Sequence, residues 1–241
     1  MEKICIKCGK LFKGINKRRF CSQRCAGIYR NEQEPNLRFS AHRHNNFILN
    51  ENTISFIDGH LLGDGSLSKP KTVNSGCRYS QLFSQKYNDW ALMTQNKFNL
   101  FNIDNNLSYY STYDKRTQKT YYSVSLQTHV YDEFLIFYKR WYPNGKKEIP
   151  KDLKINPQLM RVFYLDDGYI RGKKQIQFST DSFSDESINF LIDKLKEINL
   201  SPKTNSKRIH LYRSSDILSL LSYMNTTEFP NCFKYKGGIV S

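Results

Sequence analysis

Two stretches of the chain, TISFIDGHLLGDGSL at residues 53–67 and NPQLMRVFYLDDGYI at residues 156–170, share one pattern. In each, apolar residues recur at helical spacing, and the helix then ends in an acid followed by glycine. We expect Asn52 or Thr53 to cap the first helix, and Asn156 to cap the second. This repetition predicts that the same structural unit occurs twice after residue 50.

The segments that follow the two helices also match in order and kind. Each half continues with two predicted strands, a helix, two further strands and a last helix, and alternation of apolar and polar residues marks the strands. Residues 78–85 match 175–180 as strands, and the helix that starts near residue 88 matches the helix at 184–198. Residues 122–127 then match 208–211 as strands, and 130–142 match 214–225 as the last helices. The alternative is a generic α+β protein whose halves resemble each other by chance.

The predicted strands have one apolar face and one face rich in Ser, Gln, Thr, Arg and Lys. Helices would cover the apolar face, which leaves a polar sheet face suited to the major groove of DNA. We therefore predict the α+β class, with two related αββαββα halves that form a saddle-shaped surface for duplex DNA.

Composition agrees with a folded protein that binds a polyanion. The 241 residues are 39% hydrophobic and include 16 Tyr and 16 Phe, enough for a core without disulfides. A net charge of +15 favours nucleic acid as the partner. With no long apolar run and no signal-like N-terminus, we expect a soluble intracellular protein that binds no membrane.

Four cysteines fall within the first 25 residues, in the pattern C-x2-C-x12-C-x3-C. They are Cys5, Cys8, Cys21 and Cys25. Two close pairs that a loop brings together suit tetrahedral Zn²⁺, so we predict a structural zinc finger. The alternative is four reduced cysteines in an ordinary arm. Cys77 and Cys232 stand apart from this group and are expected to be small apolar residues.

The predicted finger, residues 1–31, carries nine basic residues against Glu2 alone. Contact with phosphates would add affinity that depends on salt; the alternatives are a solvated basic surface or a finger that binds protein. Residues 32–50 are polar and read as a basic linker.

The acids at the ends of the two repeated helices need an electrostatic partner. Asp64 and Asp167 follow the carbonyl end of a helix, where negative charge is unfavourable. Mg²⁺, which takes carboxylate, carbonyl and phosphate oxygens, would offset that charge and assist hydrolysis. Gly59 and Gly63 would let the first helix approach a neighbour closely.

The motifs DGHLLGDG and FYLDDG resemble those of the LAGLIDADG homing endonucleases, in the single-chain form with two motifs. The resemblance covers residues 51–241, with half 1 at 51–150 and half 2 at 151–241. It implies a monomer whose two motif helices pack together, and which makes metal-dependent double-strand breaks with short 3′ overhangs at the insertion site of an intron or other element.

The same resemblance implies the roles of single residues. Asp64 and Asp167 would be the catalytic acids that bind Mg²⁺, and Gly63 and Asp166 would add backbone carbonyls. The segments KKEIP and FPNCFKYK resemble those that carry a basic residue near each active site. We assign this part to Lys147 and Lys234, which would stabilise negative charge in the transition state.

Two features depart from the family pattern. Bulky Met160, Val162 and Tyr164 stand in the second motif helix where small packing residues are common, and the four-cysteine finger lies outside the core. Two other functions stay open: an RNA maturase that assists splicing by binding intron RNA, and a regulator that binds DNA without cutting it.

Overall fold

The computed structural model describes residues 2–14, 18–33, 46–72, 75–171, 174–224 and 229–237. The chain divides into two compact units, residues 1–45 and residues 46–241. Most of the predicted linker, residues 34–45, lies outside the described residues. None of the helices in the described ranges combines the length and apolar character that a membrane span requires.

The first unit is small and built around a hairpin. Strands β1 (Glu2–Ile4) and β2 (Leu11–Lys13) pair antiparallel, and helix α1 (Gln23–Gln33) follows. An ion pair between Lys7 and Glu32 joins the turn after β1 to the end of α1. The helix thus continues two residues beyond the predicted end of the finger at residue 31.

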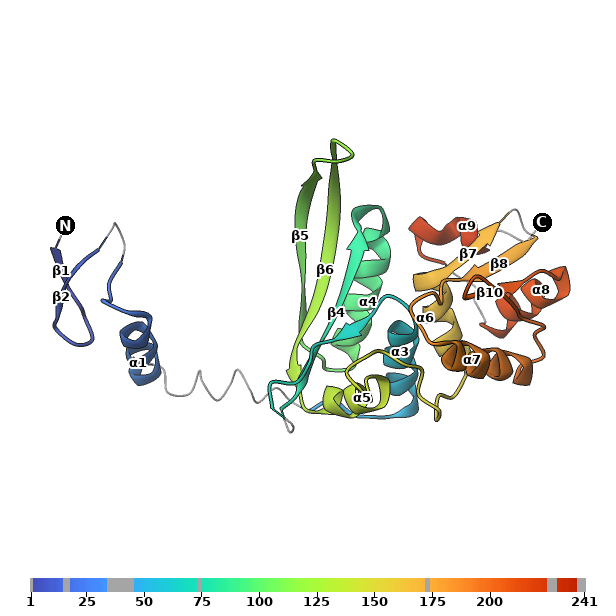
Figure 1. Ribbon diagram of the computed structural model, residues 1–241, viewed down its shortest axis with the longest axis horizontal. Coiled ribbons are helices and arrows are strands. Elements are labelled where there is room, and N and C mark those ends of the chain that lie inside the picture. The colour runs from blue at the N-terminus through green and yellow to red at the C-terminus, as the bar shows by residue number, and fades with distance from the viewer. Residues whose placement is uncertain are drawn as a thin grey trace. The chain divides into compact units, whose positions relative to one another are not determined.

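The second unit consists of two halves with the same element order (Figure 1). In the first half, the sheet has the strand order β3-β4-β6-β5. Its elements are α3 (Glu51–Leu62), β3 (Ser66–Leu67), β4 (Cys77–Ser84), η1 (Gln85–Tyr87), α4 (Asn88–Leu100), β5 (Asn105–Asp114), β6 (Lys119–Tyr131) and α5 (Glu133–Trp141).

In the second half, the sheet has the order β7-β8-β10-β9, which is the same topology. Its elements are α6 (Pro157–Asp167), β7 (Gly168–Arg171), β8 (Gln175–Phe178), α7 (Asp185–Glu197), β9 (Lys203–Asn205), β10 (Arg208–Leu211), α8 (Ser214–Tyr223), η2 (Asn231–Phe233) and α9 (Lys234–Gly237). The predicted αββαββα repeat and the α+β class are confirmed.

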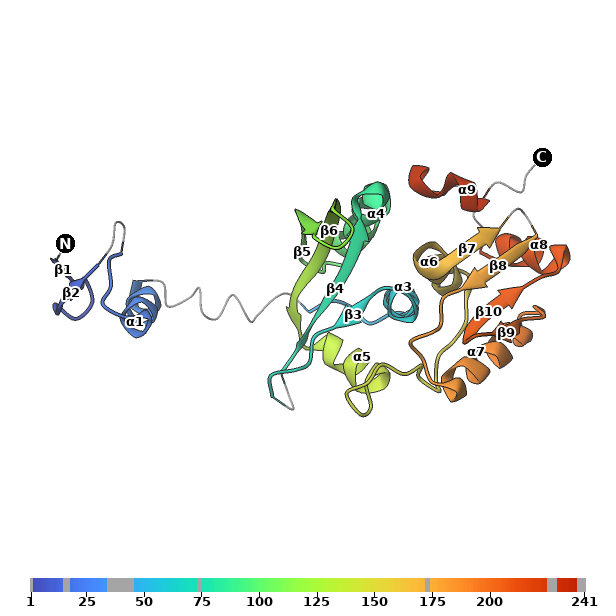
Figure 2. The ribbon, with the colours of Figure 1, turned by 45° about the horizontal axis from the view of Figure 1, so that its top comes forward.

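The two repeated helices, α3 and α6, lie side by side between the two sheets (Figure 2). Both begin at an asparagine whose side chain accepts a hydrogen bond from the backbone N–H of the third residue after it. Asn50 accepts from Thr53 at 2.9 Å, and Asn156 accepts from Leu159 at 2.9 Å. The prediction for Asn156 is confirmed. The prediction of Asn52 or Thr53 as the first cap was wrong, because Asn50 has the extended backbone and the free acceptor that a cap requires.

Close contact between α3 and α6 depends on Gly59 of α3. A Cβ atom on Gly59 would lie 2.8 Å from Cβ of Val162 and 2.9 Å from the Leu159 carbonyl oxygen. Met160, Val162 and Tyr164 are all buried, so the bulk of α6 does not keep the two helices apart. The glycine on one helix provides the space that the side chain on the other occupies.

Each sheet has one buried and one exposed face, as the alternation predicts. Along β4, Cys77, Tyr79 and Phe83 are buried while Arg78 and Leu82 are exposed. In the second half, Ile176 and Phe178 of β8 enter the core. The helices cover the apolar faces, and the other faces stay accessible to a partner.

Candidate active site

Asp64 and Asp167 are brought together at the ends of the two central helices. Helix α3 ends at Leu62 with Gly63 as its C-cap, and Asp64 follows; Asp167 is the last residue of α6. Both acids line one cavity of 290 Å³, together with Asp166 and Lys236. The predicted pair of motif acids therefore shares a single site, to which each half contributes one.

The electrostatics of this cavity disfavour ionised acids in the absence of a cation. Burial raises the pKa of the Asp64 carboxyl to about 6, and the negative charge of Asp166 adds to the shift. Burial also raises the pKa of Asp167 to about 7, and the charge of Asp64 adds to it. Crowded carboxylates at two helix C-termini are the oxygen ligands that Mg²⁺ takes, so the donor set fits a divalent cation.

Lys147 lies beside Asp64, and its part in catalysis stays a prediction. Its Nζ donates to the carbonyl oxygens of Gly63 at 3.0 Å and Gly65 at 2.8 Å, on either side of Asp64. Burial lowers the pKa of Lys147 to about 8, against the attraction of Asp167, Asp166 and Asp64. The attraction of these three carboxylates favours the charged ammonium.

In the segment predicted to carry the second lysine, the structure buries Lys236 beside the acids and leaves Lys234 exposed, and the catalytic part given to Lys234 stays a prediction. Lys236 is 3% exposed, and its Nζ donates to the carbonyl oxygens of Tyr164 at 2.9 Å and Leu165 at 2.8 Å. Burial lowers the pKa of Lys236 to about 8. Both lysines lie in the short helix α9, where side chains two apart point to different sides, and Lys234 is exposed.

Asp166 takes part in the site in a way that the sequence did not indicate. We predicted that it offers a backbone carbonyl, and this remains a prediction. Its carboxylate is fully buried and accepts hydrogen bonds from His60, Gln81 and Trp90. These three residues belong to the first half, and only the folded structure brings them to the end of α6.

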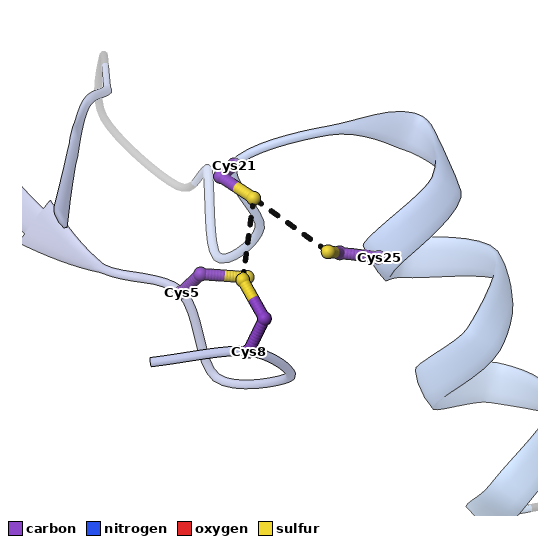
Figure 3. A group of neighbouring side chains, drawn as sticks. All are labelled: Cys5, Cys8, Cys21 and Cys25. Atoms are coloured by element: carbon purple, nitrogen blue, oxygen red, sulfur yellow. Dashed lines mark hydrogen bonds between the residues drawn. The ribbon is translucent and has the colours of Figure 1, made fainter. Parts of the chain in front are cut away.

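The four N-terminal cysteines form a separate cluster in the first unit (Figure 3). Their sulfur atoms all lie within 4.8 Å of one another, and Sγ of Cys21 is 3.6 Å from those of Cys8 and Cys25. Four sulfurs at about 2.3 Å from a tetrahedral Zn²⁺ would be about 3.8 Å apart. The neighbouring thiols of Cys25 and Cys8 raise the pKa of Cys21 to about 12. The group has the composition and spacing to hold a metal ion.

The remaining cysteines do not join this cluster. Cys77 is fully buried in the core, as expected of a small apolar residue, and Cys232 is half-buried. Burial raises the pKa of the Cys77 thiol to about 11, which keeps it in the unreactive protonated form.

The paired central helices, with an acid from each half in one cavity, can be compared with known families. Residues 54–216 match the LAGLIDADG DNA endonuclease family. The chain belongs to this family.

Similar proteins come from an archaeon and from yeasts. An uncharacterized protein of Methanocaldococcus jannaschii is 28% identical over 72% of this chain and 69% of its own length. A protein of Debaryomyces hansenii named cytochrome b mRNA maturase bI2 is 26% identical over 79% of this chain and 75% of its own length. Its namesake in Saccharomyces cerevisiae is 32% identical, over 59% of this chain and 36% of that protein.

A similar solved structure is described as the homing endonuclease I-WcaI bound to its DNA recognition sequence. It aligns with a TM-score of 0.69 and 20% identity, and the alignment covers 93% of this chain and 95% of that one. At this level of identity, the likeness establishes the shared fold.

Proposed function

We propose that this chain is a site-specific DNA endonuclease that hydrolyses one phosphodiester bond in each strand of a duplex, acting as a monomer. The observation that carries the proposal is the shared cavity, which Asp64 from one half and Asp167 from the other line together with Lys236, while Lys147 binds the carbonyls on either side of Asp64. One chain thus holds two acids and two cations in a pseudo-symmetric arrangement, which suits the two antiparallel strands of a duplex.

The residues of the site divide the chemistry between them. The carboxylates of Asp64 and Asp167 would hold Mg²⁺, with the expected help of the Asp166 carbonyl; the Gly63 carbonyl, also predicted as a ligand, accepts from Lys147 in the free protein. Bound Mg²⁺ supplies a Lewis acid for the phosphate and lowers the pKa of a bound water. Lys147 stays protonated and fixed by two carbonyls beside Asp64, where its charge can stabilise the negative charge that develops on the phosphate.

Lys236 would likewise stabilise negative charge on the phosphate, in the second half of the site. Two carbonyls near the end of α6 hold its Nζ, so the ammonium is placed in advance and needs no reorganisation when charge develops. The two lysines differ in one respect: Lys147 binds carbonyls on either side of Asp64, whereas Lys236 binds carbonyls two and three residues before Asp167.

The exposed sheet faces would read the bases, and the two sheets differ in length. Strands β5 and β6 pair over ten residues, about 34 Å at about 3.4 Å per residue, which is close to one turn of DNA. Strands β9 and β10 have three and four residues. We therefore expect the first sheet to contact a longer part of the target than the second, with basic Lys115, Arg116 and Lys119 near the hairpin tip beside phosphates.

Substitution of two neighbouring tyrosines of β6 tests which face of the first sheet contacts DNA. Tyr122 is two residues from Val124, which is buried on the helix-covered face, whereas Tyr121 is on the opposite face with Ser123 and Ser125. Tyr121 is 49% exposed and Tyr122 is 59% exposed, so neither supports the core. Tyr121→Ala should weaken specific binding by about 0.5–1.5 kcal/mol, the contribution of one hydrogen bond, and relax base preference under the hairpin. Tyr122→Ala is the matched control.

Binding to a library of randomised targets measures this difference. Equal losses for Tyr121→Ala and Tyr122→Ala, or no loss for either, would contradict the placement of DNA on that face of the sheet.

For the first unit we propose a zinc finger that adds non-specific affinity through its basic residues. Deletion of residues 1–31 should weaken DNA binding and flatten its salt dependence, by about 0.9 in the log–log slope for each phosphate that the finger neutralises. The cleavage position should stay the same. Binding titrations at several salt concentrations, with mapping of the cut, check this. A moved cut with unchanged binding would contradict it.

An RNA maturase is the second candidate, and the two yeast relatives favour it because both are named cytochrome b mRNA maturases. A maturase would bind its intron transcript more tightly than the matching DNA. Competition between that transcript and the duplex for the purified chain separates the two functions.

The test of the proposed nuclease uses a plasmid that carries the uninterrupted version of the chain's own locus. We expect the purified chain to linearise it with Mg²⁺ and to bind without cutting in EDTA. Tight binding with no cleavage at any metal concentration would contradict the nuclease and favour the maturase or a regulator.

A further inference from the structure

Asp166 and Gly63 hold matching positions in the two motifs but differ completely in what they contribute. Each directly precedes the acid of its motif, Asp167 or Asp64. A Cβ on Gly63 would lie 2.6 Å from Cβ of Asp166 and 3.0 Å from its Oδ2. The missing side chain in the first half is therefore what makes room for the carboxylate of the second.

The Asp166 carboxylate is bound entirely by donors from the other half. Oδ1 accepts from Trp90 Nε1 of α4 at 2.7 Å and from Gln81 Nε2 of β4 at 3.0 Å. Oδ2 lies 2.8 Å from Nδ1 of His60, on α3. The side chains of His60 and Asp166 are both fully buried. One carboxylate thus joins the end of α6 to three elements of the first half.

The three donors are themselves held in place. Gln81 accepts a hydrogen bond from the buried Tyr79 hydroxyl at 2.5 Å, which orients its amide toward Asp166. The His60 ring stacks on Trp90, with 5.6 Å between centroids, and meets Phe56 edge to face at 4.6 Å. A carboxylate in such a setting has one position, because moving it would leave buried donors without partners.

No described residue of α3 places a carboxylate in the second half as Asp166 of α6 does in the first. Asp58, the buried acid of α3, is bound by Arg140 at 3.1 Å and by Trp141 Nε1 at 2.8 Å, and both belong to its own half. We call the contact of the Asp166 carboxylate with His60, Gln81 and Trp90 the clamp. Among the described residues of α3 it has no counterpart, so it connects the halves in one direction only, from α6 to the first half.

We infer that Asp166 is a positioning residue: its buried carboxylate, bound by His60, Gln81 and Trp90, fixes the end of α6 against the first half and so sets Asp167 relative to Asp64. Asp166 does this without contacting DNA or reacting atoms through its side chain. The inference rests on the proposed nuclease only in its consequence for cleavage; the clamp itself is a property of the free protein.

The consequence is coordinated cutting of the two strands. Asp64 and Asp167 are each one residue from the point where Gly63 meets Asp166, so a small shift there moves one acid relative to the other. A displacement of about 1 Å in a catalytic geometry costs roughly 10²-fold in rate. Without the clamp, one strand cut should slow more than the other and leave a nicked intermediate, while DNA binding by the distant sheet faces changes little.

Two indole donors in the chain provide a matched pair of variants. Trp90→Phe removes the N–H that binds Asp166, and Trp141→Phe removes the N–H that binds Asp58. Both changes leave a ring in the core and one buried carboxylate with a donor fewer. On the plasmid described above, Trp90→Phe and Asp166→Ala should raise the ratio of nicked to linear product about tenfold or more, with Trp141→Phe close to wild type.

Asp166→Asn separates positioning from charge. The asparagine Oδ1 can accept from Trp90 and Gln81, and its Nδ2 can donate to His60 Nδ1 once the imidazole proton resides on Nε2, where it has no partner among the described residues. Asn should therefore restore part of the coordinated cutting that Ala abolishes. If Asp166→Asn is as inactive as Asp64→Asn, the negative charge acts directly and the positioning role is wrong.

A measurement on the free protein needs no DNA and distinguishes failure of the clamp from failure of the nuclease proposal. Amide hydrogen exchange at residues 163–167 should become faster in Trp90→Phe and Asp166→Ala, and stay as in wild type in Trp141→Phe. Unchanged exchange in both clamp variants overturns the inference whatever the chain does to DNA. Faster exchange with no cleavage by wild type would refute the nuclease alone.

Discussion

Asp64→Asn and Asp167→Asn should each reduce double-strand cleavage by at least about 10²–10³-fold, because each removes a carboxylate that would hold Mg²⁺ in the cavity that the two acids share. DNA binding should be kept or strengthened, since each variant removes a negative charge from a crowded group of carboxylates that would face the phosphates. Single-turnover cleavage and binding in EDTA measure the two effects.

Asp193→Asn is the control for these variants. Asp193 is exposed on α7, where its carboxylate pairs with Lys196 at 2.8 Å, so its replacement removes a negative charge that does not line the cavity. An Asp64 or Asp167 variant that cuts as fast as Asp193→Asn would contradict the role given to the acids.

The second large effect concerns the two lysines of α9. Lys236→Met should lower the cleavage rate by about 10²-fold, because it removes a buried ammonium from a site where negative charge develops. Lys234→Met should leave cleavage within about twofold, because that side chain is exposed. The same substitution two residues apart, in one short helix, controls for the change of charge.

Strand-resolved cleavage assays check this pair of variants, with thermal melting to confirm folding. A loss of cleavage in Lys234→Met with Lys236→Met unaffected would restore the position predicted from sequence and contradict the geometry. Lys147→Met should behave like Lys236→Met, since its Nζ is held in the same way beside Asp64.

Local patterns predicted most of the fold correctly. Alternation marked the strands around Val124 and Ile209, and the Asn156 cap followed from a side chain that binds a backbone N–H three residues away. Such signals depend on neighbours along the chain. The first cap was predicted at the wrong residue because the side chains of Asn50, Asn52 and Thr53 can all cap a helix. Only the backbone conformation decides which of them does so.

The site was predictable where a motif fixes a residue, and not where distant segments meet. Asp64 and Asp167 stand out because acids at helix C-termini are unfavourable without a partner. Lys236 and Lys234 differ only in which side of a short helix each occupies, which sequence cannot resolve. The clamp joins Asp166 to residues that lie between 76 and 106 positions away in the sequence, so no local pattern predicts it.

Mapping of both DNA ends tests the central claim that the two halves form one metal-dependent nuclease site. Wild type and the Asp64→Asn and Asp167→Asn variants would be incubated in parallel with the uninterrupted locus, in Mg²⁺ or in EDTA, and the ends of each strand sequenced. We predict breaks at one position in both strands, made only by wild type and only with Mg²⁺. Scattered ends, or cutting that persists in EDTA or in either variant, would contradict the account.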